Sequence, residues 1–139
     1  MKLSIIKKIK KLIIFFPILI YLGERSYLAY DEGFYALQAR WIIDNNNWII
    51  PQWWDVYNLD RTIGIQYLIA KSQLIFGKNP FAAHIPTTLA AFLMIYLTYK
   101  LHEQLLEKKG AIYSSLILTT TYIWFDFAHQ ATQDMIFAC

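Results

Sequence analysis

The 139-residue chain has one cysteine, Cys139, and only 17% of its residues are charged. A single cysteine cannot form an internal disulfide bond, which excludes a disulfide-stabilised scaffold. Disordered chains combine low hydrophobicity with high net charge, whereas 57% of these residues are hydrophobic and the formal net charge is +3. Soluble proteins average about 25% charged residues. The scarcity of charge therefore favours a membrane protein, and the distribution of the apolar residues supports this.

Three apolar segments are separated by charged ones. The first, Leu12–Leu22, would rise only about 16 Å as a helix, so crossing a hydrocarbon core of roughly 30 Å requires extension to Tyr30. The second, Phe81–Tyr99, contains no Asp, Glu, Lys or Arg, and the third begins at Gly110. We therefore predict an all-α, polytopic membrane protein with transmembrane helices at 12–30 and 81–99 and a third that, with its outer end, covers 110–139. A cleaved signal peptide is the alternative for the first segment, although no small-x-small cleavage site follows it.

The placement of lysines predicts the orientation of these helices. Residues 1–11 contain five lysines and no acidic residue, and the short segment 100–109 contains three more lysines. Short cytoplasmic loops collect Lys and Arg, so we expect both segments to be cytoplasmic and residues 31–80 to lie outside. Anionic lipid head groups account for the surplus of positive charge. We therefore expect membrane lipids, and no nucleic acid, as partners.

The external segment 31–80 predicts two helices rather than a linker. Asn45–Asn47 and Gly77–Pro80 are typical turn sequences, and they delimit two periodic stretches, Asp31–Asp44 and Thr62–Phe76. The expected apolar faces consist of Tyr30, Phe34, Leu37 and Trp41 on the first helix, and of Ile65, Leu68, Ile69, Ile75 and Phe76 on the second, with Gln66 and Gln73 elsewhere. Helices lying in the membrane interface fit this pattern. The four tryptophans of the segment fit membrane anchoring or stacking on a carbohydrate, and composition leaves both open.

Acidic side chains occur where the chain is expected to leave the membrane on the external side. Asp31 and Glu32 follow the first crossing, and Asp134 lies roughly 24 residues into the third, about 36 Å along a helix. A carboxylate beside a polar cavity can act as a general base or bind a cation. His84 and His129 would complete an oxygen and nitrogen metal set, although the sequence has no closely spaced ligand motif. The alternative is that Asp31 and Glu32 only begin a helix, where acidic residues are favoured.

Several short motifs, in their order along the chain, resemble a known family. Asp31–Arg40 (DEGFYALQAR) and Asn47–Pro51 (NWIIP) are similar to the first external loop of the protein O-mannosyltransferase and aminoarabinose-transferase superfamily. The resemblance continues through Ile75–Gly77, Ala82–Pro86 and Ala131–Met135, and it spans nearly the whole chain. Members are integral-membrane glycosyltransferases of the GT-C fold that use a sugar carried on a polyprenyl phosphate. The resemblance therefore implies a bacterial inner-membrane protein whose active site faces away from the cytoplasm.

The resemblance also implies roles for individual residues. Asp31 would be the catalytic base that deprotonates an acceptor hydroxyl or amine, so that the acceptor displaces polyprenyl phosphate from the anomeric carbon with inversion. Glu32 would support Asp31, and Asp134 would be the second acidic residue, sharing a divalent cation with Asp31. Arg61 and His84 stand at basic positions of the family that are expected to contact the donor phosphate. No nucleotide cofactor is implied, and the sequence contains no Gly-rich phosphate loop.

Two departures separate this chain from typical members of the superfamily. Arg61 stands where the family often has Lys-Pro-Pro, and His84 stands where it commonly has Arg. The run Asp134–Cys139 is still apolar at the last residue, so we expect the N-terminal part of a longer enzyme, inactive by itself. The alternatives are a small non-catalytic accessory or anchor protein, or an inactive truncated relic. The sequence specifies neither the sugar nor whether the acceptor is a lipid, a polysaccharide or a protein.

Overall fold

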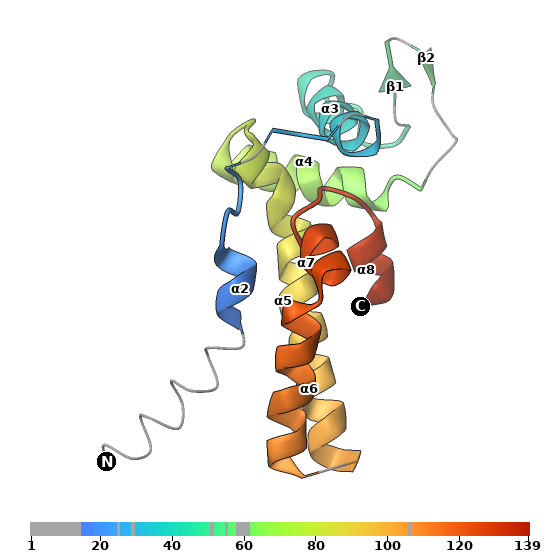
Figure 1. The fold of residues 1–139 in the computed structure, drawn as a ribbon. Helices are drawn as coiled ribbons and strands as arrows, with labels where there is room; N and C mark the ends of the chain where they lie inside the picture. Colours follow the sequence, from blue (N-terminus) through green and yellow to red (C-terminus); the bar gives the residue numbers. More distant parts are fainter. Residues whose placement is uncertain are drawn as a thin grey trace.

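The structure, a computed structural model, describes residues 15–24, 26–28, 30–50, 52–54, 56–57, 62–105 and 107–139. This part of the chain is mostly helical, which confirms the all-α prediction, and it also has one short antiparallel hairpin. The elements in chain order are α2 (Phe16–Leu19), α3 (Asp31–Asp44), β1 (Gln52–Trp53), β2 (Val56–Tyr57), α4 (Gly64–Phe76), α5 (Pro80–Leu105), α6 (Lys108–Thr120), α7 (Tyr122–Ala128) and α8 (Asp134–Ala138). Figure 1 shows a long pair of helices, α5 and α6, with α3 and α4 lying across one end of it.

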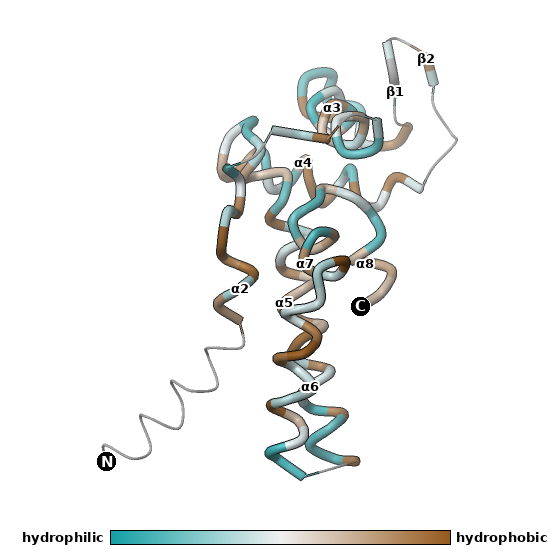
Figure 2. Tube along the Cα trace, in the orientation of Figure 1, coloured by the Kyte–Doolittle hydropathy of each residue, from teal (hydrophilic) through white to brown (hydrophobic). Residues whose placement is uncertain are grey.

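Helix α5 connects the two ends of the molecule. Within the described ranges it is the one helix that is long and apolar enough to cross a membrane. The segment 81–99, predicted as a transmembrane helix, lies inside α5, and residues 100–105 of the predicted loop are helical as well. Small buried residues, among them Ala91 and Ala111, lie in the core that α5 and α6 share, and small residues let helices approach closely in membranes. Figure 2 shows hydrophilic residues at the turn between α5 and α6, where the sequence predicts a cytoplasmic loop.

The segment 110–139, predicted as a third transmembrane helix with its outer end, is not one continuous helix. Helix α6 stops at Thr120, α7 follows Thr121, and α8 begins only after the non-helical segment 129–133. Thr121 has an extended backbone (φ −70°, ψ 118°). The hydroxyls of Thr120 and Thr121 each donate to a carbonyl oxygen one turn earlier, at 2.8 Å. Such bonds and β-branching both weaken a helix, so the chain breaks here and α8 folds back beside α7 (Figure 1).

The prediction of a continuous helix over 12–30 is also wrong for the residues that the structure describes. Helix α2 ends at Leu19, and residues 20–24 form turns. Gly23 has a φ of +78°, and a Cβ atom placed on it would lie 2.6 Å from Cβ of Phe81, at the start of α5. Glycine alone fits both this backbone region and this contact. Residues 1–11, predicted to be cytoplasmic, lie outside the described part of the chain.

Helices α3 and α4 have nearly the predicted bounds. On α4 the expected apolar residues Ile65 and Ile69 are buried, whereas on α3 the buried residues are not those of the expected apolar face. Helix α3 begins and ends as predicted, and α4 begins at Gly64 instead of Thr62. The expected apolar residues Tyr30 and Leu37 are 91% and 41% exposed. The buried residues of the two helices are instead Glu32, Tyr35, Ala36, Gln38, Ala39 and Ile42 on α3, and Ile65, Gln66, Ile69, Ala70, Ser72 and Gln73 on α4. The polar residues are tolerated in part because they pair: the side-chain amides of Gln38 and Gln66 are 2.9 Å apart.

Asn79 and Gly77 define the turn between α4 and α5. Oδ1 of Asn79 accepts a hydrogen bond from the backbone N–H of Ala82 (2.8 Å), and its Nδ2 donates to the carbonyl oxygen of Phe76 (2.9 Å). Asn79 therefore caps the first turn of α5 and the last turn of α4 together, with Pro80 at the favoured first helical position. Gly77, with a φ of +86°, ends α4, as the Gly-Lys-Asn-Pro sequence predicts.

The buried apolar residues form two clusters. One joins α2, α5, α6, α7 and α8 around Ile95 and Trp124, and the other joins α3 and α4 to the start of α5. Ala131, from the segment between α7 and α8, belongs to the second cluster. The segment 129–133 therefore packs against the layer formed by α3 and α4. This packing places Ala131 next to Glu32.

Candidate functional site

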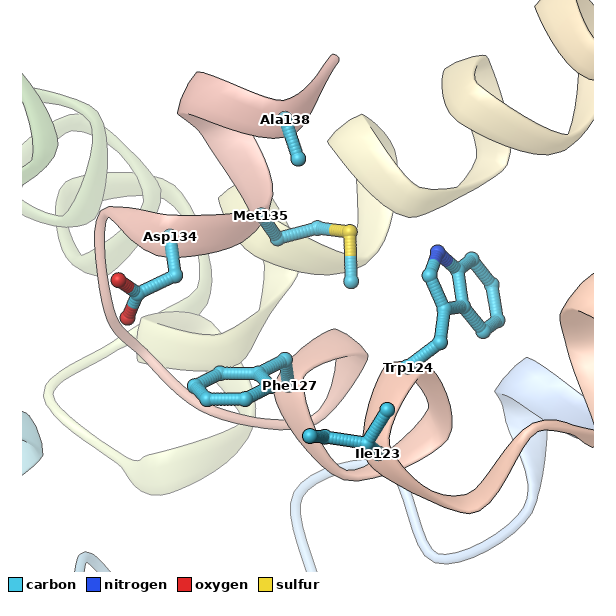
Figure 3. Close-up of a pocket in the computed structure, with 6 residues that line it drawn as sticks. All are labelled: Ile123, Trp124, Phe127, Asp134, Met135 and Ala138. Atoms are coloured by element: carbon cyan, nitrogen blue, oxygen red, sulfur yellow. The ribbon is translucent and has the colours of Figure 1, made fainter.

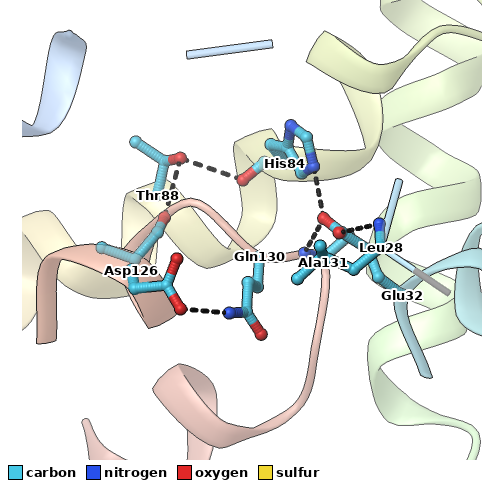
Figure 4. A network of polar contacts seen from close by, with 8 residues as sticks. Leu28, Glu32, His84, Thr88, Asp126, Gln130 and Ala131 are labelled. Carbon is cyan, nitrogen blue, oxygen red and sulfur yellow. Dashed lines mark hydrogen bonds and ion pairs between the residues drawn. The ribbon is translucent and has the colours of Figure 1, made fainter. Parts of the chain in front are cut away.

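Glu32 joins three segments that are far apart in the sequence. It is 1% exposed, and its Oε2 accepts a hydrogen bond from the backbone N–H of Leu28 at 2.7 Å. Its Oε1 accepts one from the backbone N–H of Ala131 at 2.9 Å and lies 2.5 Å from Nε2 of His84. Figure 4 shows these contacts converging on one carboxylate. The first turn of α3, the start of α5 and the segment 129–133 therefore meet at this point.

Two opposing effects act on the pKa of Glu32. Burial raises the pKa, because it disfavours the charged form, and it is the largest single effect. Hydrogen bonds from His84, Leu28 and Ala131 favour the carboxylate, and together they hold the pKa of Glu32 below its ordinary value of 4.5. At neutral pH Glu32 is therefore an ionised acceptor whose two oxygens are both engaged, and this makes it a poor general base.

His84 is buried beside Glu32 at the start of α5. The ring is 1% exposed, and Nε2 must carry a proton to donate to an ionised carboxylate. The ring of Tyr27 meets it edge-on, with the centroids 6.0 Å apart. The resemblance implies contact between His84 and a donor phosphate, and this contact stays a prediction. In the structure the buried ring is bonded to Glu32.

Asp31 lies directly before Glu32, at the first position of α3, and its side chain is exposed. The N-terminal turn carries the positive end of the helix dipole, where carboxylates are favoured. Tyr30, which precedes it, has a φ of 71°, a conformation uncommon for residues other than glycine. The chain therefore turns sharply into α3 and presents Asp31 at the surface while Glu32 points inward.

Asp134 is the first residue of α8 and borders a pocket of about 270 Å³. The other lining residues are apolar: Ile123, Trp124, Phe127, Met135 and Ala138. Figure 3 places the Asp134 carboxylate on the side of the pocket opposite Trp124. The sequence predicts that Asp134 comes to the same surface as Asp31 and Glu32. The structure brings the segment leading into Asp134 against Glu32, through Ala131.

The structure does not test two predicted features of the site, the phosphate contact of Arg61 and the shared metal ion. Arg61, predicted to contact the donor phosphate, lies outside the described residues. The part of the chain that the structure describes contains no group of three or more His, Cys, Asp or Glu side chains placed to hold a metal ion. The cation shared by Asp31 and Asp134 therefore stays a prediction.

Other contacts of the site could not be read from the sequence. The donors from Leu28 and Ala131 are backbone N–H groups, which every residue except proline carries.

His129, considered as a metal ligand, instead directs both ring nitrogens at backbone carbonyl oxygens: Nδ1 at Phe125 (2.8 Å) and Nε2 at Ile18 (2.7 Å). It therefore joins α7 to α2. The sequence offers only a general indication of these contacts of His129: a lone histidine in an apolar segment usually forms hydrogen bonds inside the protein.

Residues 60–139, more than half of the chain, match the family model described as dolichyl-phosphate-mannose-protein mannosyltransferase. The chain belongs to this mannosyltransferase family. The resemblance to the GT-C glycosyltransferase superfamily is thereby confirmed. The match covers α4 to α8, including His84 and Asp134, and begins after Asp31 and Glu32. The bonds from Glu32 to His84 and Ala131 therefore fasten α3 to the part of the chain that matches the mannosyltransferase family.

Three bacterial relatives share one name, undecaprenyl phosphate-alpha-4-amino-4-deoxy-L-arabinose arabinosyl transferase. The protein of Enterobacter sp. (strain 638) is 30% identical over 108 residues, which cover 75% of this chain and 19% of the relative. That of Shewanella sediminis is 35% identical over 79 residues (55% and 14%), and that of Erwinia tasmaniensis is 28% identical over 120 residues (84% and 21%). This mannosyltransferase family member therefore spans only about a fifth, or less, of the length of these relatives. No solved structure matches the chain.

Proposed function

We propose that this chain acts as the N-terminal part of an integral-membrane glycosyltransferase. The enzyme would move a sugar from a polyprenyl-phosphate donor to an acceptor on the extracytoplasmic side of a bacterial inner membrane. The names of the relatives support this donor class, since each name refers to an amino sugar linked to undecaprenyl phosphate. The structural observation that carries the proposal is the meeting of the first turn of α3, which holds Asp31, with the segment that leads into Asp134.

Asp31 is the general base of the proposed reaction. Its carboxylate accepts the proton of an acceptor hydroxyl or amine. The acceptor atom forms a bond to the anomeric carbon from the face opposite the leaving group, while the bond from that carbon to the phosphate oxygen breaks. The polyprenyl phosphate leaves with the electron pair, and the configuration is inverted. The exposed position of Asp31 supports this assignment, because an acceptor must reach it.

The phosphate and metal parts of the proposal rest on the sequence. Arg61 is proposed to contact the donor phosphate, since guanidinium groups bind phosphate with two parallel hydrogen bonds. No step of the proposed reaction passes through a metal ion. A cation shared by Asp31 and Asp134 would draw most of its ligands from water, and removal with EDTA followed by addition of Mg²⁺ or Mn²⁺ tests for it.

Replacing Asp31 with Asn in the full-length protein tests the base. General bases contribute about 10²- to 10⁴-fold to rates, so we expect Asp31→Asn to reduce kcat at least 100-fold. The assay follows consumption of a polyprenyl-phosphate-linked amino sugar by mass spectrometry, with lipid, polysaccharide and protein acceptors. Asp44→Asn is the matched control, because Asp44 ends the same helix and pairs with Lys78. Turnover by Asp31→Asn equal to that of the control would remove Asp31 from the mechanism. Absence of turnover by the wild type as well would favour the non-catalytic anchor protein.

A further inference from the structure

We propose that Glu32 is a positioning residue of the same site: its carboxylate, bonded to His84, fastens the segment 129–133 to the first turn of α3 and so fixes Asp134 relative to Asp31. This inference rests on the proposed function and extends it. It gives Glu32 and His84 a task different from base catalysis and from phosphate contact.

The sequence separations of the three donors show that Glu32 makes more than local contacts. Only the bond from Leu28, four residues away, is local. The other donors, His84 and Ala131, lie 52 and 99 residues away. Bonds over these separations fix tertiary structure, and a hydrogen bond to a charge in a water-excluded interior is stronger than one at the surface.

The backbone of the fastened segment depends on this carboxylate. Ala131 is fully buried, and its N–H donates to Oε1 of Glu32. A buried N–H that loses its acceptor carries a desolvation cost, so removing the carboxylate favours movement of the segment toward water. A glutamate suits this junction because its two oxygens can accept the N–H groups of Leu28 and Ala131 and still accept from His84.

A second contact holds the start of the same segment. Oγ1 of Thr88, on α5, lies 3.0 Å from the carbonyl oxygen of His84 and 3.5 Å from that of Ala128, at the end of α7 (Figure 4). The segment leaves α7 immediately after Ala128. It is therefore tied to α5 where it begins and to Glu32 at its third residue, Ala131.

Short chain lengths connect this junction to both candidate carboxylates. Asp134 is three residues after Ala131, so their Cα atoms are at most about 11 Å apart. Asp31 is adjacent to Glu32, with the Cα atoms about 3.8 Å apart. Fixing Glu32 to Ala131 therefore limits how far Asp134 can move relative to Asp31. A displacement of 1 Å at reacting groups costs about 100-fold in rate.

Glu32→Gln in the full-length protein tests the proposal. An amide has one acceptor oxygen and one donor nitrogen, so it cannot accept from all three groups. We expect kcat to fall about 100-fold, with the KM for the polyprenyl-phosphate-linked amino sugar changed less than about threefold because donor contacts are untouched. We also expect faster hydrogen–deuterium exchange in peptides covering 129–133. Glu103→Gln is the matched control: Glu103 pairs with Lys100 near the far end of α5.

Three outcomes of this experiment are decisive. A loss of kcat with faster exchange at 129–133 supports the positioning role. A loss of kcat with unchanged exchange overturns it, because Glu32 would then act on the substrate directly. Activity equal to that of Glu103→Gln also overturns it. Turnover by Asp31→Asn would refute the base assignment without changing the hydrogen–deuterium exchange expected for Glu32→Gln. Failure of the base assignment can therefore be distinguished from failure of the positioning role.

Variants of His84 keep the proposal testable if Glu32→Gln does not fold. His84→Phe retains a buried ring but donates no hydrogen bond, and it should reproduce the faster exchange at 129–133 and the loss of kcat. His84→Arg restores a donor to Glu32 and should recover part of both. If His84→Phe leaves exchange and kcat unchanged, His84 does not position Glu32. His102→Phe, at the other end of α5, is the control, because His102 bonds only within its own helix in the contacts observed, to Thr98.

Discussion

Replacing Gly23 with Ala tests how the N-terminal segment is held against α5. At this position φ is +78°, and an added Cβ would lie 2.6 Å from Cβ and 2.7 Å from Cα of Phe81. The left-handed backbone costs an L-residue about 1–2 kcal/mol, and overpacking costs about 1–3 kcal/mol. We therefore expect Gly23→Ala to lower the free energy of unfolding by about 2–5 kcal/mol. Because the atoms in conflict include backbone at the start of a long helix, little relief is available.

The measurement is unfolding of the purified protein in mixed micelles, titrated with SDS and followed by circular dichroism. Gly33→Ala is the matched control. A Cβ there would meet only the carbonyl oxygen of Leu28 at an ordinary 3.6 Å, and alanine is better than glycine in a helix by up to about 1 kcal/mol. The control should therefore be neutral or more stable than the wild type. Equal stability of the two variants would refute the close contact between Gly23 and Phe81.

Two further predictions concern the junctions around the site. Because the pKa of Glu32 lies below 4.5 in the folded protein, its stabilising effect is complete above that pH and is lost as the pH falls through the lowered pKa. Thermal unfolding can be measured between pH 6 and pH 3, roughly the range over which carboxylates titrate. We expect the stability of the wild type to fall more steeply with decreasing pH than that of Glu32→Gln. Parallel curves of stability against pH would contradict this. Asn79→Ala removes the bonds to Ala82 and Phe76 and should cost about 1–2 kcal/mol. Asn47→Ala, whose contacts are longer at 3.3 and 3.4 Å, should cost less in the same SDS titration.

Helix bounds were predictable wherever short-range signals define them. Helix α3 matches its prediction at both ends, and Gly77 and Asn79 fix the turn between α4 and α5 by chemistry visible in the sequence. The third apolar segment was mispredicted because apolar composition is compatible with both a continuous and a broken helix. The hydroxyls of Thr120 and Thr121 bond back to the helix they follow, and this effect does not change the hydrophobicity of the segment.

The apolar face expected on α3 differs from the face that the protein buries. Periodicity selected larger apolar residues, including Tyr30 and Leu37, which are exposed, whereas Ile65 and Ile69 of the face expected on α4 are buried. The structure buries Ala36 and Ala39 instead, because small side chains let two helices approach closely, and Gln38 finds its partner on the other helix. A membrane surface can accommodate exposed apolar residues, so in such a protein the most hydrophobic face need not be the buried one.

The sequence by itself determined the helical class, the candidate carboxylates Asp31, Glu32 and Asp134, and the superfamily, because residue order and local chemistry carry this information. Only the tertiary structure separated the tasks of adjacent residues: Asp31 is exposed, whereas Glu32 is buried with three donors. The physical reason is that two of these donors are backbone N–H groups and the third is a histidine 52 residues away. Their convergence depends on the packing of α3, α5 and the segment 129–133, which no local pattern specifies.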